Sequence, residues 1–158
     1  MFRIGGIVEN SLIDAEGISR VIFFQGCKKR CQGCHNPQFL DFNAGEEITE
    51  EEALYGNSEE TFTDWIDVIV LCGGEPLDQP EAVRKISKLA HESKKQCWLY
   101  TGNILENIDP EFLEDIDVVI DGEWKEELQC KLQFRSSSNQ RLFRKVDGKW
   151  IKDEKENS

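Results

Sequence analysis

Three of the six cysteines in this 158-residue chain lie within eight residues, and their spacing restricts the local fold more than any other feature. Cys27, Cys31 and Cys34 follow the pattern C-x3-C-x2-C. Thiolates at this spacing turn inward together when their segment loops around a common centre, and soft sulfur ligands favour an iron–sulfur cluster or zinc. Three thiolates suit three corners of a [4Fe-4S] cube and leave its fourth iron open to a substrate.

Two alternatives to a cluster stay open at this point. A structural zinc site normally has four protein ligands. His35 is the one nearby candidate for a fourth ligand, but it adjoins Cys34, and adjacent residues rarely point at one metal. No second C-x2-C or H-x3-H follows downstream. Cysteines without any metal are the other alternative, and they leave the regular spacing unexplained. The pattern therefore favours an iron–sulfur cluster.

Apolar runs separated by turn residues predict strands that alternate with helices. Strands are expected at residues 18–25, 66–72, 97–102 and 117–121, with an edge strand at 2–8 and a late hairpin of 141–146 with 150–151. Helices are expected at 36–42, 110–114 and 123–132, and two more are capped by Thr49 and Asp78. This alternation predicts parallel β/α units joined by right-handed crossovers. A complete (β/α)8 barrel is excluded because it needs about 250 residues.

Charge and hydropathy restrict the possible partners and location. The net charge of −12 argues against nonspecific binding to nucleic acid or to an anionic membrane. Residues 1–130 carry 27 acidic and 11 basic side chains, whereas residues 131–158 carry 4 acidic and 8 basic ones. This asymmetry indicates either a solvated surface or a C-terminal docking surface for a protein. No apolar run is long enough to span a bilayer or act as a signal peptide, so a cytoplasmic protein without disulfides is expected.

The cysteine pattern resembles the signature of radical S-adenosylmethionine (SAM) enzymes. Residues 14–17 and 36–37 are similar to activating enzymes of glycyl-radical proteins, and residues 72–77 match the GGEPL element of that family. Residues 117–122, with Ser-Ser-Ser-Asn-Gln-Arg at 136–141, resemble the activating proteins of anaerobic ribonucleoside-triphosphate reductase. The resemblance runs from about Gly6 to Phe143. The chain departs from the family pattern at three positions, namely Ala15 in place of Gly, Ser19 in place of Arg and Cys72 in place of Ser or Thr.

The resemblance implies an α/β fold, an incomplete radical SAM β/α barrel with mainly parallel strands. The length predicts one domain over 1–158, with a disordered tail at 152–158. It also implies a [4Fe-4S] cluster on Cys27, Cys31 and Cys34, whose open iron binds the amino and carboxylate groups of SAM. Gly73, Gly74 and Glu75 would line the amino end of SAM. Thr101 and Asp121 are candidates for the adenosyl side. Gly33, Cys34 and His35 would flank the adenine.

The function implied by the resemblance is reductive cleavage of SAM, followed by abstraction of a Cα hydrogen to make a glycyl radical on anaerobic ribonucleoside-triphosphate reductase. The partners would be the reductase large subunit and a reduced donor such as flavodoxin or another low-potential reductant. Two alternatives stay open: a radical SAM enzyme for a small molecule, of the queuosine-pathway type, and a metal-binding interaction module without turnover. Cys72 and Cys97 are expected to be small buried hydrophobes. Cys130 is a candidate for electron relay or a second metal site.

Overall fold

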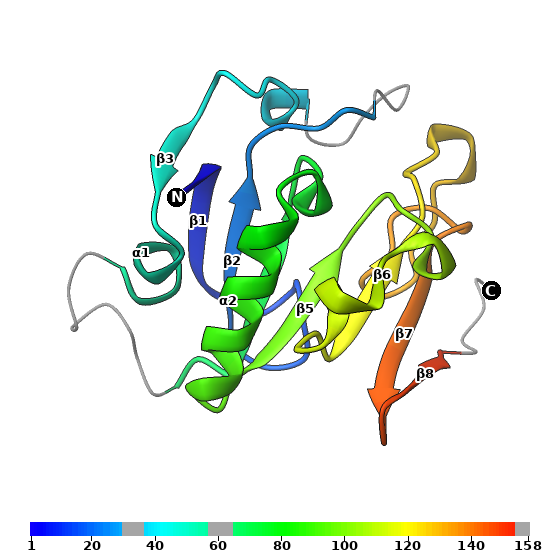
Figure 1. Ribbon diagram of the computed structural model, residues 1–158. Coiled ribbons are helices and arrows are strands. Elements are labelled where there is room, and N and C mark those ends of the chain that lie inside the picture. Colours follow the sequence, from blue (N-terminus) through cyan, green and yellow to red (C-terminus); the bar gives the residue numbers. More distant parts are fainter. Residues whose placement is uncertain (30–36, 57–64, 154–158) are drawn as a thin grey trace.

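The computed structural model describes residues 1–29, 37–56 and 65–153, and its strands form one sheet with two helices beside it (Figure 1). The strands lie in the order β3-β1-β2-β4-β5-β6-β7-β8. Their bounds are β1 Phe2–Ser11, β2 Ser19–Phe24, β3 Glu46–Ile48, β4 Val68–Gly73, β5 Gln96–Tyr100, β6 Val118–Asp121, β7 Arg141–Val146 and β8 Lys149–Lys152. The helices are α1 Glu50–Tyr55 and α2 Pro80–Glu92, and 3-10 turns cover Pro37–Phe39, Pro76–Asp78, Leu105–Asn107, Pro110–Leu113 and Glu126–Leu128.

The four central strands of the sheet are parallel to one another. β2 pairs with β4, β4 with β5, and β5 with β6 in parallel. β1 and β3 extend the sheet antiparallel on one side, and β7 and β8 do so on the other. The prediction of parallel β/α units is confirmed for this centre. Because parallel strands share a direction, their carboxyl ends meet at one edge of the sheet.

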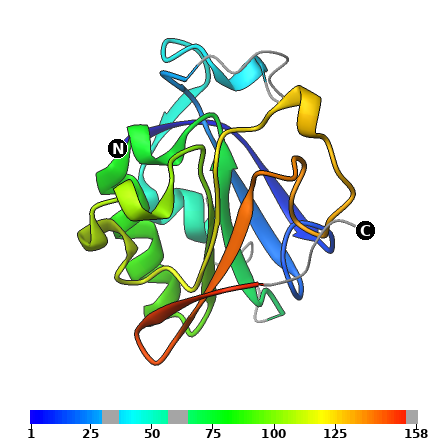
Figure 2. The same ribbon diagram turned by 90° about the vertical axis from the view of Figure 1, so that its right-hand side faces the viewer.

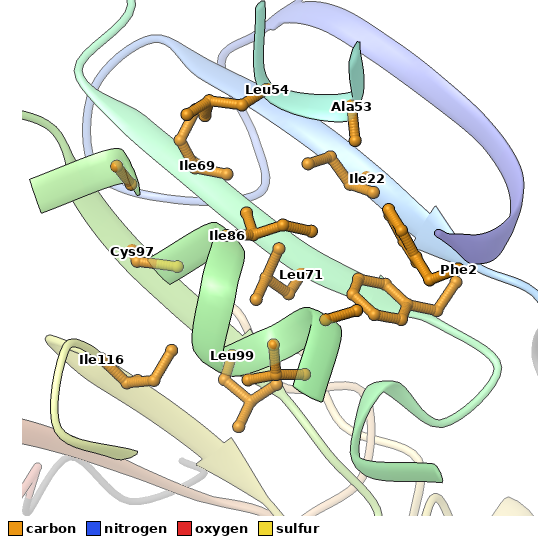
Figure 3. Close-up of a cluster of buried hydrophobic side chains, with 14 of the residues drawn as sticks. Phe2, Ile22, Ala53, Leu54, Ile69, Leu71, Ile86, Cys97, Leu99 and Ile116 are labelled. Carbon is orange, nitrogen blue, oxygen red and sulfur yellow. The ribbon is translucent and has the colours of Figure 1, made fainter. Parts of the chain in front are cut away.

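Both faces of the central strands are buried, which explains why their sequences are nearly continuous apolar runs. Ile69, Leu71 and Leu99 point to the face that α1 and α2 cover (Figure 3). Val70 and Trp98 point to the opposite face, which we call the inner face. Figure 2 shows α2 on one side of the sheet and the segment 123–140 on the other. The strand period of two thus divides the core into two clusters.

The two helix caps predicted from sequence have different outcomes. Thr49 caps α1 as predicted, because its hydroxyl oxygen accepts a hydrogen bond from the Glu52 amide at 3.1 Å. The prediction that Asp78 caps α2 is wrong. α2 begins at Pro80, and its N-cap residue Gln79 makes no side-chain capping bond. Proline at the first turn suits a helix start without a cap, because its missing N–H would have no intrahelical partner there.

The segment after β6 does not form the helix predicted at 123–132. One 3-10 turn at Glu126–Leu128 is its only helical part. The backbone of this segment bonds instead to the stretch that follows it, since Cys130 N donates to Ser136 O at 3.1 Å and Ser138 N donates to Leu128 O at 2.7 Å. Apolar and charged residues in this segment look helical by pattern, but its hydrogen bonds are made across the segment.

Smaller differences concern the two ends of the chain. β1 runs to Ser11, and β3 pairs along its outer side, so β1 is not an edge strand. The late hairpin is confirmed, with positive φ at both residues of its Asp147-Gly148 turn. Lys152 belongs to β8 rather than to a tail, and residues 154–158 lie outside the described residues. Within the described ranges, no helix is long and apolar enough to cross a membrane.

Candidate functional site

A cavity of about 590 Å³ lies on the inner face at the carboxyl ends of the central strands. Its floor is a row of side chains from neighbouring strands, namely Phe23 on β2, Cys72 on β4, Tyr100 on β5 and Ile120 on β6. Glycines at the ends of β4, β5 and β6 line its rim, and the segment 123–140 forms a further wall. Ligands of parallel α/β sheets bind at this edge, so the cavity is the candidate site.

The base of the cysteine loop is closed by backbone hydrogen bonds. Gly26 N donates to Phe39 O at 2.7 Å, and Cys27 N donates to Leu40 O at 3.2 Å. All three motif cysteines fall between Gly26 and Phe39 in the sequence, so the two ends of the motif segment meet at this base. Cys27 is 8% exposed and lines the cavity. The predicted site residues Cys31, Gly33, Cys34 and His35 lie outside the described residues.

The cysteine loop is held against the end of β4. Glu75 N donates to Gly26 O at 2.9 Å. Asp78 accepts a hydrogen bond from Lys28 N at 2.8 Å, which gives this carboxylate a role in place of the predicted cap. The Gln25 side chain donates to Gln38 O and Asp41 O at 3.1 and 2.8 Å. These bonds attach both ends of the loop to the sheet.

Gly73 and Gly74 allow the end of β4 to pass directly against β2 and the loop. Gly73 has φ +109°, and a Cβ there would stand 2.5 Å from both the nitrogen and the oxygen of Phe24. A Cβ on Gly74 would overlap the carbonyl oxygen of Gly26 and stand 2.5 Å from that of Phe39. Both glycines, which are predicted to line the amino end of SAM, line the cavity. They are also required by the backbone that holds the cysteine loop.

The Glu75 carboxylate joins the ends of β4 and β5. It is 1% exposed and accepts hydrogen bonds from the Thr101 hydroxyl at 2.8 Å, the Gly102 amide at 2.7 Å and the Leu77 amide at 3.0 Å. Burial raises the pKa of Glu75, and these donors partly oppose that rise. Glu75 and Thr101 both line the cavity, but their polar atoms already bond to each other.

Asp121 lies behind the cavity wall rather than in it. Its carboxylate is fully buried and accepts hydrogen bonds from Arg141 Nε at 3.1 Å, from Arg141 Nη2 at 2.6 Å and from the Leu105 amide at 2.8 Å. This pairing raises the pKa of Arg141. Asp121 is not among the residues that line the cavity, whereas its neighbours Ile120 and Gly122 are.

The Ser-Ser-Ser-Asn-Gln-Arg stretch at 136–141 fixes the segment 123–140 at the cavity by hydrogen bonds. Gln140 Oε1 accepts hydrogen bonds from the amides of Ser136 and Ser137 at 2.9 and 3.1 Å, and its Nε2 donates to Gly122 O at 3.2 Å. Asn139 Nδ2 donates to Glu123 O at 2.8 Å. Sequence reasoning identified this stretch by resemblance alone, and its structural role is to hold the cavity wall to the end of β6.

Several lining residues were missed by sequence reasoning. Tyr100 precedes the predicted Thr101 and points to the inner face, where its hydroxyl donates to Asp14 O at 2.6 Å. The strand period of two was the signal that could have identified Tyr100. Lys29 reaches Glu123 at 3.4 Å across the cavity. Phe134 and Arg135 lie in a segment that carries no periodic signal, so only the tertiary structure places them here.

The structure also shows the surroundings of Cys72, Cys97 and Arg20, the residue after Ser19. Cys97 is fully buried among apolar side chains, as predicted, and Cys72 is only half-buried because it lines the cavity. Burial raises the pKa of both thiols. Arg20 does not replace the family arginine at position 19, since its side chain bonds to Ala53 O at 2.9 Å on the helix-covered face. Adjacent strand residues point to opposite faces.

The described residues fit an iron–sulfur cluster at the mouth of the cavity. Cys27 supplies a thiol at the cavity wall, and the bonds from Gly26 to Phe39 and from Cys27 to Leu40 bring the two ends of the motif segment together. The glycines at the end of β4 place backbone beside this loop without side chains between. The Glu75 carboxylate, which could compete for a metal, is satisfied by three donors. Soft thiolate donors remain the fitting ligands.

Comparisons with known proteins agree with this site. Residues 13–143 match the family described as a 4Fe-4S single cluster domain. The anaerobic ribonucleoside-triphosphate reductase-activating protein of Enterobacteria phage T4 is 33% identical, over 89% of this chain and 93% of that protein. The chain belongs to this family of reductase-activating proteins. The Haemophilus influenzae member is 29% identical, over 84% of this chain and 92% of that protein.

Two further relatives extend the comparison. The pyruvate formate-lyase-activating enzyme of Clostridium pasteurianum is 36% identical over 76% of this chain, which spans about half (51%) of that enzyme. The crystal structure of QueE from Escherichia coli superposes with a TM-score of 0.55 at 13% identity, covering 79% of this chain and 60% of QueE. That likeness concerns the fold alone and confirms the incomplete β/α barrel. The chain described by this structure is thus a radical SAM activating enzyme with a [4Fe-4S] cluster and SAM as cofactors.

Proposed function

We propose that this enzyme makes a glycyl radical on anaerobic ribonucleoside-triphosphate reductase. The observation that carries the proposal is the match to reductase-activating proteins over nearly their whole length, 93% of the phage T4 protein. Residues 136–141, by which the chain resembles reductase-activating proteins, also build the wall of the cavity. The partner is therefore the reductase large subunit, and a low-potential reductant such as reduced flavodoxin supplies the electron.

We propose the following roles at the site, and those of Cys31, Gly33, Cys34 and His35 rest on the family resemblance alone. Cys27, Cys31 and Cys34 hold the cluster. Gly73 and Gly74 line the amino end of SAM and keep the loop against the sheet. Glu75 and Thr101 hold the ends of β4 and β5 together beneath the amino end of SAM. Gly33 and His35 flank the adenine. Asp121 acts from behind the wall by anchoring Arg141, a positioning role rather than contact with SAM.

The protein residues position the reactants, and the bound groups supply the chemistry. Held by Cys27, Cys31 and Cys34, a bound cluster would supply the electron for reductive cleavage of SAM, the chemistry that leads to removal of a glycine Cα hydrogen atom. The cavity floor is apolar where Phe23, Tyr100 and Ile120 meet, which excludes water from a reactive site. The sheet ends in β3 and β8 within the described residues, so the barrel wall is open there to a protein loop.

The test is anaerobic incubation of the reconstituted enzyme with SAM, a reduced donor and the reductase. We expect a glycyl doublet in the EPR spectrum of the reductase, and deuterium transfer into 5′-deoxyadenosine when the target glycine is deuterated at Cα. A doublet that is absent while a small molecule is turned over efficiently would contradict the proposal. Stoichiometric zinc without visible absorption would contradict the cluster itself.

A further inference from the structure

One buried cation in the cavity has no role in the account above. Arg135 is 6% exposed as a residue and lines the cavity. Its guanidinium can donate five hydrogen bonds and accept none. Its Nε atom is buried without a hydrogen-bond partner, and Nη2 lies 3.6 Å from a carboxylate oxygen of Asp153, an ion pair longer than a hydrogen bond. A buried donor of this kind loses free energy unless it meets an acceptor.

The guanidinium and the cysteine loop lie at the same cavity but beside different strands. Asp153, which pairs with Arg135, bonds through its amide to Leu142 O on β7. Cys27 follows β2, and β4, β5 and β6 lie between β2 and β7 in the sheet order. At about 4.8 Å per strand, these four steps correspond to roughly 19 Å of sheet. Arg135 is also close enough to Tyr100 on β5 for its charge to act on that side chain. A ligand group that meets Arg135 therefore lies over the part of the cavity between β5 and β7.

The surroundings of Arg135 favour a neutral acceptor over a second anion. Asp153 already provides a carboxylate for its charge. Asp14, Glu75 and Glu123 add acidic side chains to the cavity lining, against one further cation, Lys29. The neighbouring walls are aromatic, since Phe134 packs edge-on against Trp98 at 5.1 Å. A peptide carbonyl oxygen meets these conditions, because it accepts hydrogen bonds and brings no charge.

We propose that Arg135 binds a backbone carbonyl oxygen of the substrate peptide that enters the cavity from the β7 side. The proposal rests on the proposed function, since it gives the reductase's glycine-bearing loop a contact on this chain. A hydrogen bond from the guanidinium orients the loop, so Arg135 is a substrate-binding residue rather than a ligand of SAM. The other acceptor for a hydrogen bond from Arg135 is a group of SAM, such as its carboxylate, and the experiment separates SAM from the peptide.

The test compares Arg135→Gln with the wild type as reconstituted holoenzymes. SAM affinity is measured from the EPR change of the reduced cluster, and radical yield is titrated with the reductase large subunit. We expect the KM for the reductase to rise roughly tenfold or more, the effect of one lost hydrogen bond from a charged group. SAM affinity and SAM cleavage without the reductase should stay within about twofold of the wild type. A weakened SAM affinity with an unchanged KM would overturn the proposal in favour of SAM.

Three controls separate folding and charge from binding. Asp153→Asn removes the ion pair but keeps the guanidinium, so it should leave the KM unchanged. An equal rise in KM would show that Arg135 acts only through Asp153 and would overturn the proposal. Lys125→Gln removes an exposed positive charge from the same segment and should change nothing. Arg135→Lys keeps the charge without Nε, and it replaces Arg135→Gln as the test if that variant fails to fold.

The wild-type sample separates this proposal from the proposed function. If the wild type makes a radical on the reductase and Arg135→Gln and Arg135→Lys match it across the titration, only the role of Arg135 is refuted. If the wild type makes no radical, both proposals fall.

Discussion

At the scale of single residues, Gly73 and Gly74 have a packing role besides the ligand contact that the sequence predicts. Gly73 and Gly74 were predicted to let backbone approach SAM. They line the cavity, but their missing side chains also leave space for Phe24, Gly26 and Phe39. A substitution here therefore acts first on the cysteine loop.

We predict that Gly74→Val loses iron as well as stability. Its branched side chain would overlap the carbonyl oxygens of Gly26 and Phe39, which are backbone atoms and cannot rotate away. Overpacking of this kind costs about 1–3 kcal/mol. Iron content per chain and the midpoint of thermal unfolding should both fall. Gly6→Ala is the matched control, because a Cβ there meets nothing within 4 Å. A Gly74→Val protein with full iron would contradict the prediction.

At the scale of elements, the cysteine loop depends on the turn between β4 and α2. The turn Pro76–Asp78 follows directly on Gly73-Gly74-Glu75, and its last residue bonds to Lys28 in the loop. α2 begins only at Pro80 and needs no help from Asp78. The carboxylate that looks like a helix cap in sequence therefore belongs functionally to the loop.

We predict that Asp78→Ala loosens the cysteine loop and leaves α2 intact. The Lys28 amide would lose its acceptor at a cost of about 1 kcal/mol. Chelator-driven loss of iron should become faster, while the helical signal in circular dichroism stays at the wild-type value. Thr49→Ala serves as the comparison, since it removes a true cap from α1. Loss of helical signal in Asp78→Ala with unchanged iron retention would restore the capping interpretation.

At the scale of the whole molecule, part of the positive charge of the C-terminal segment pairs with carboxylates of the acidic part. Arg141 pairs with Asp121 and Glu106, and Arg144 pairs with Glu16. Lys145 donates to the carbonyl oxygens of Leu113 and Glu114 at 2.6 and 3.0 Å. The charge asymmetry between residues 1–130 and 131–158 therefore serves to attach β7 to the parallel core. Its second interpretation, a docking surface for a partner, stays a prediction.

We predict that Arg141→Met is much more destabilising than Arg144→Met. Removing Arg141 leaves the fully buried Asp121 carboxylate without its cation, and breaking a buried pair in this way costs about 3–5 kcal/mol. Arg144 and Glu16 are both more than two-fifths exposed, so their pair contributes less than about 1 kcal/mol. Urea unfolding of both variants measures the difference. Equal losses would mean that Asp121 is solvated or protonated without its partner.

The sequence by itself determined the local features of this protein. Continuous apolar runs bounded by turn residues placed the four central strands, and the spacing of Cys27, Cys31 and Cys34 indicated the cluster, because both signals depend on residues near in the chain. Only the tertiary structure decided which residues of distant segments contact one another. Asp78 joins the loop rather than α2, Asp121 faces Arg141 rather than the cavity, and Arg135 enters the wall from a segment without periodicity. These placements depend on hydrogen bonds and charges between distant segments, which no local pattern contains.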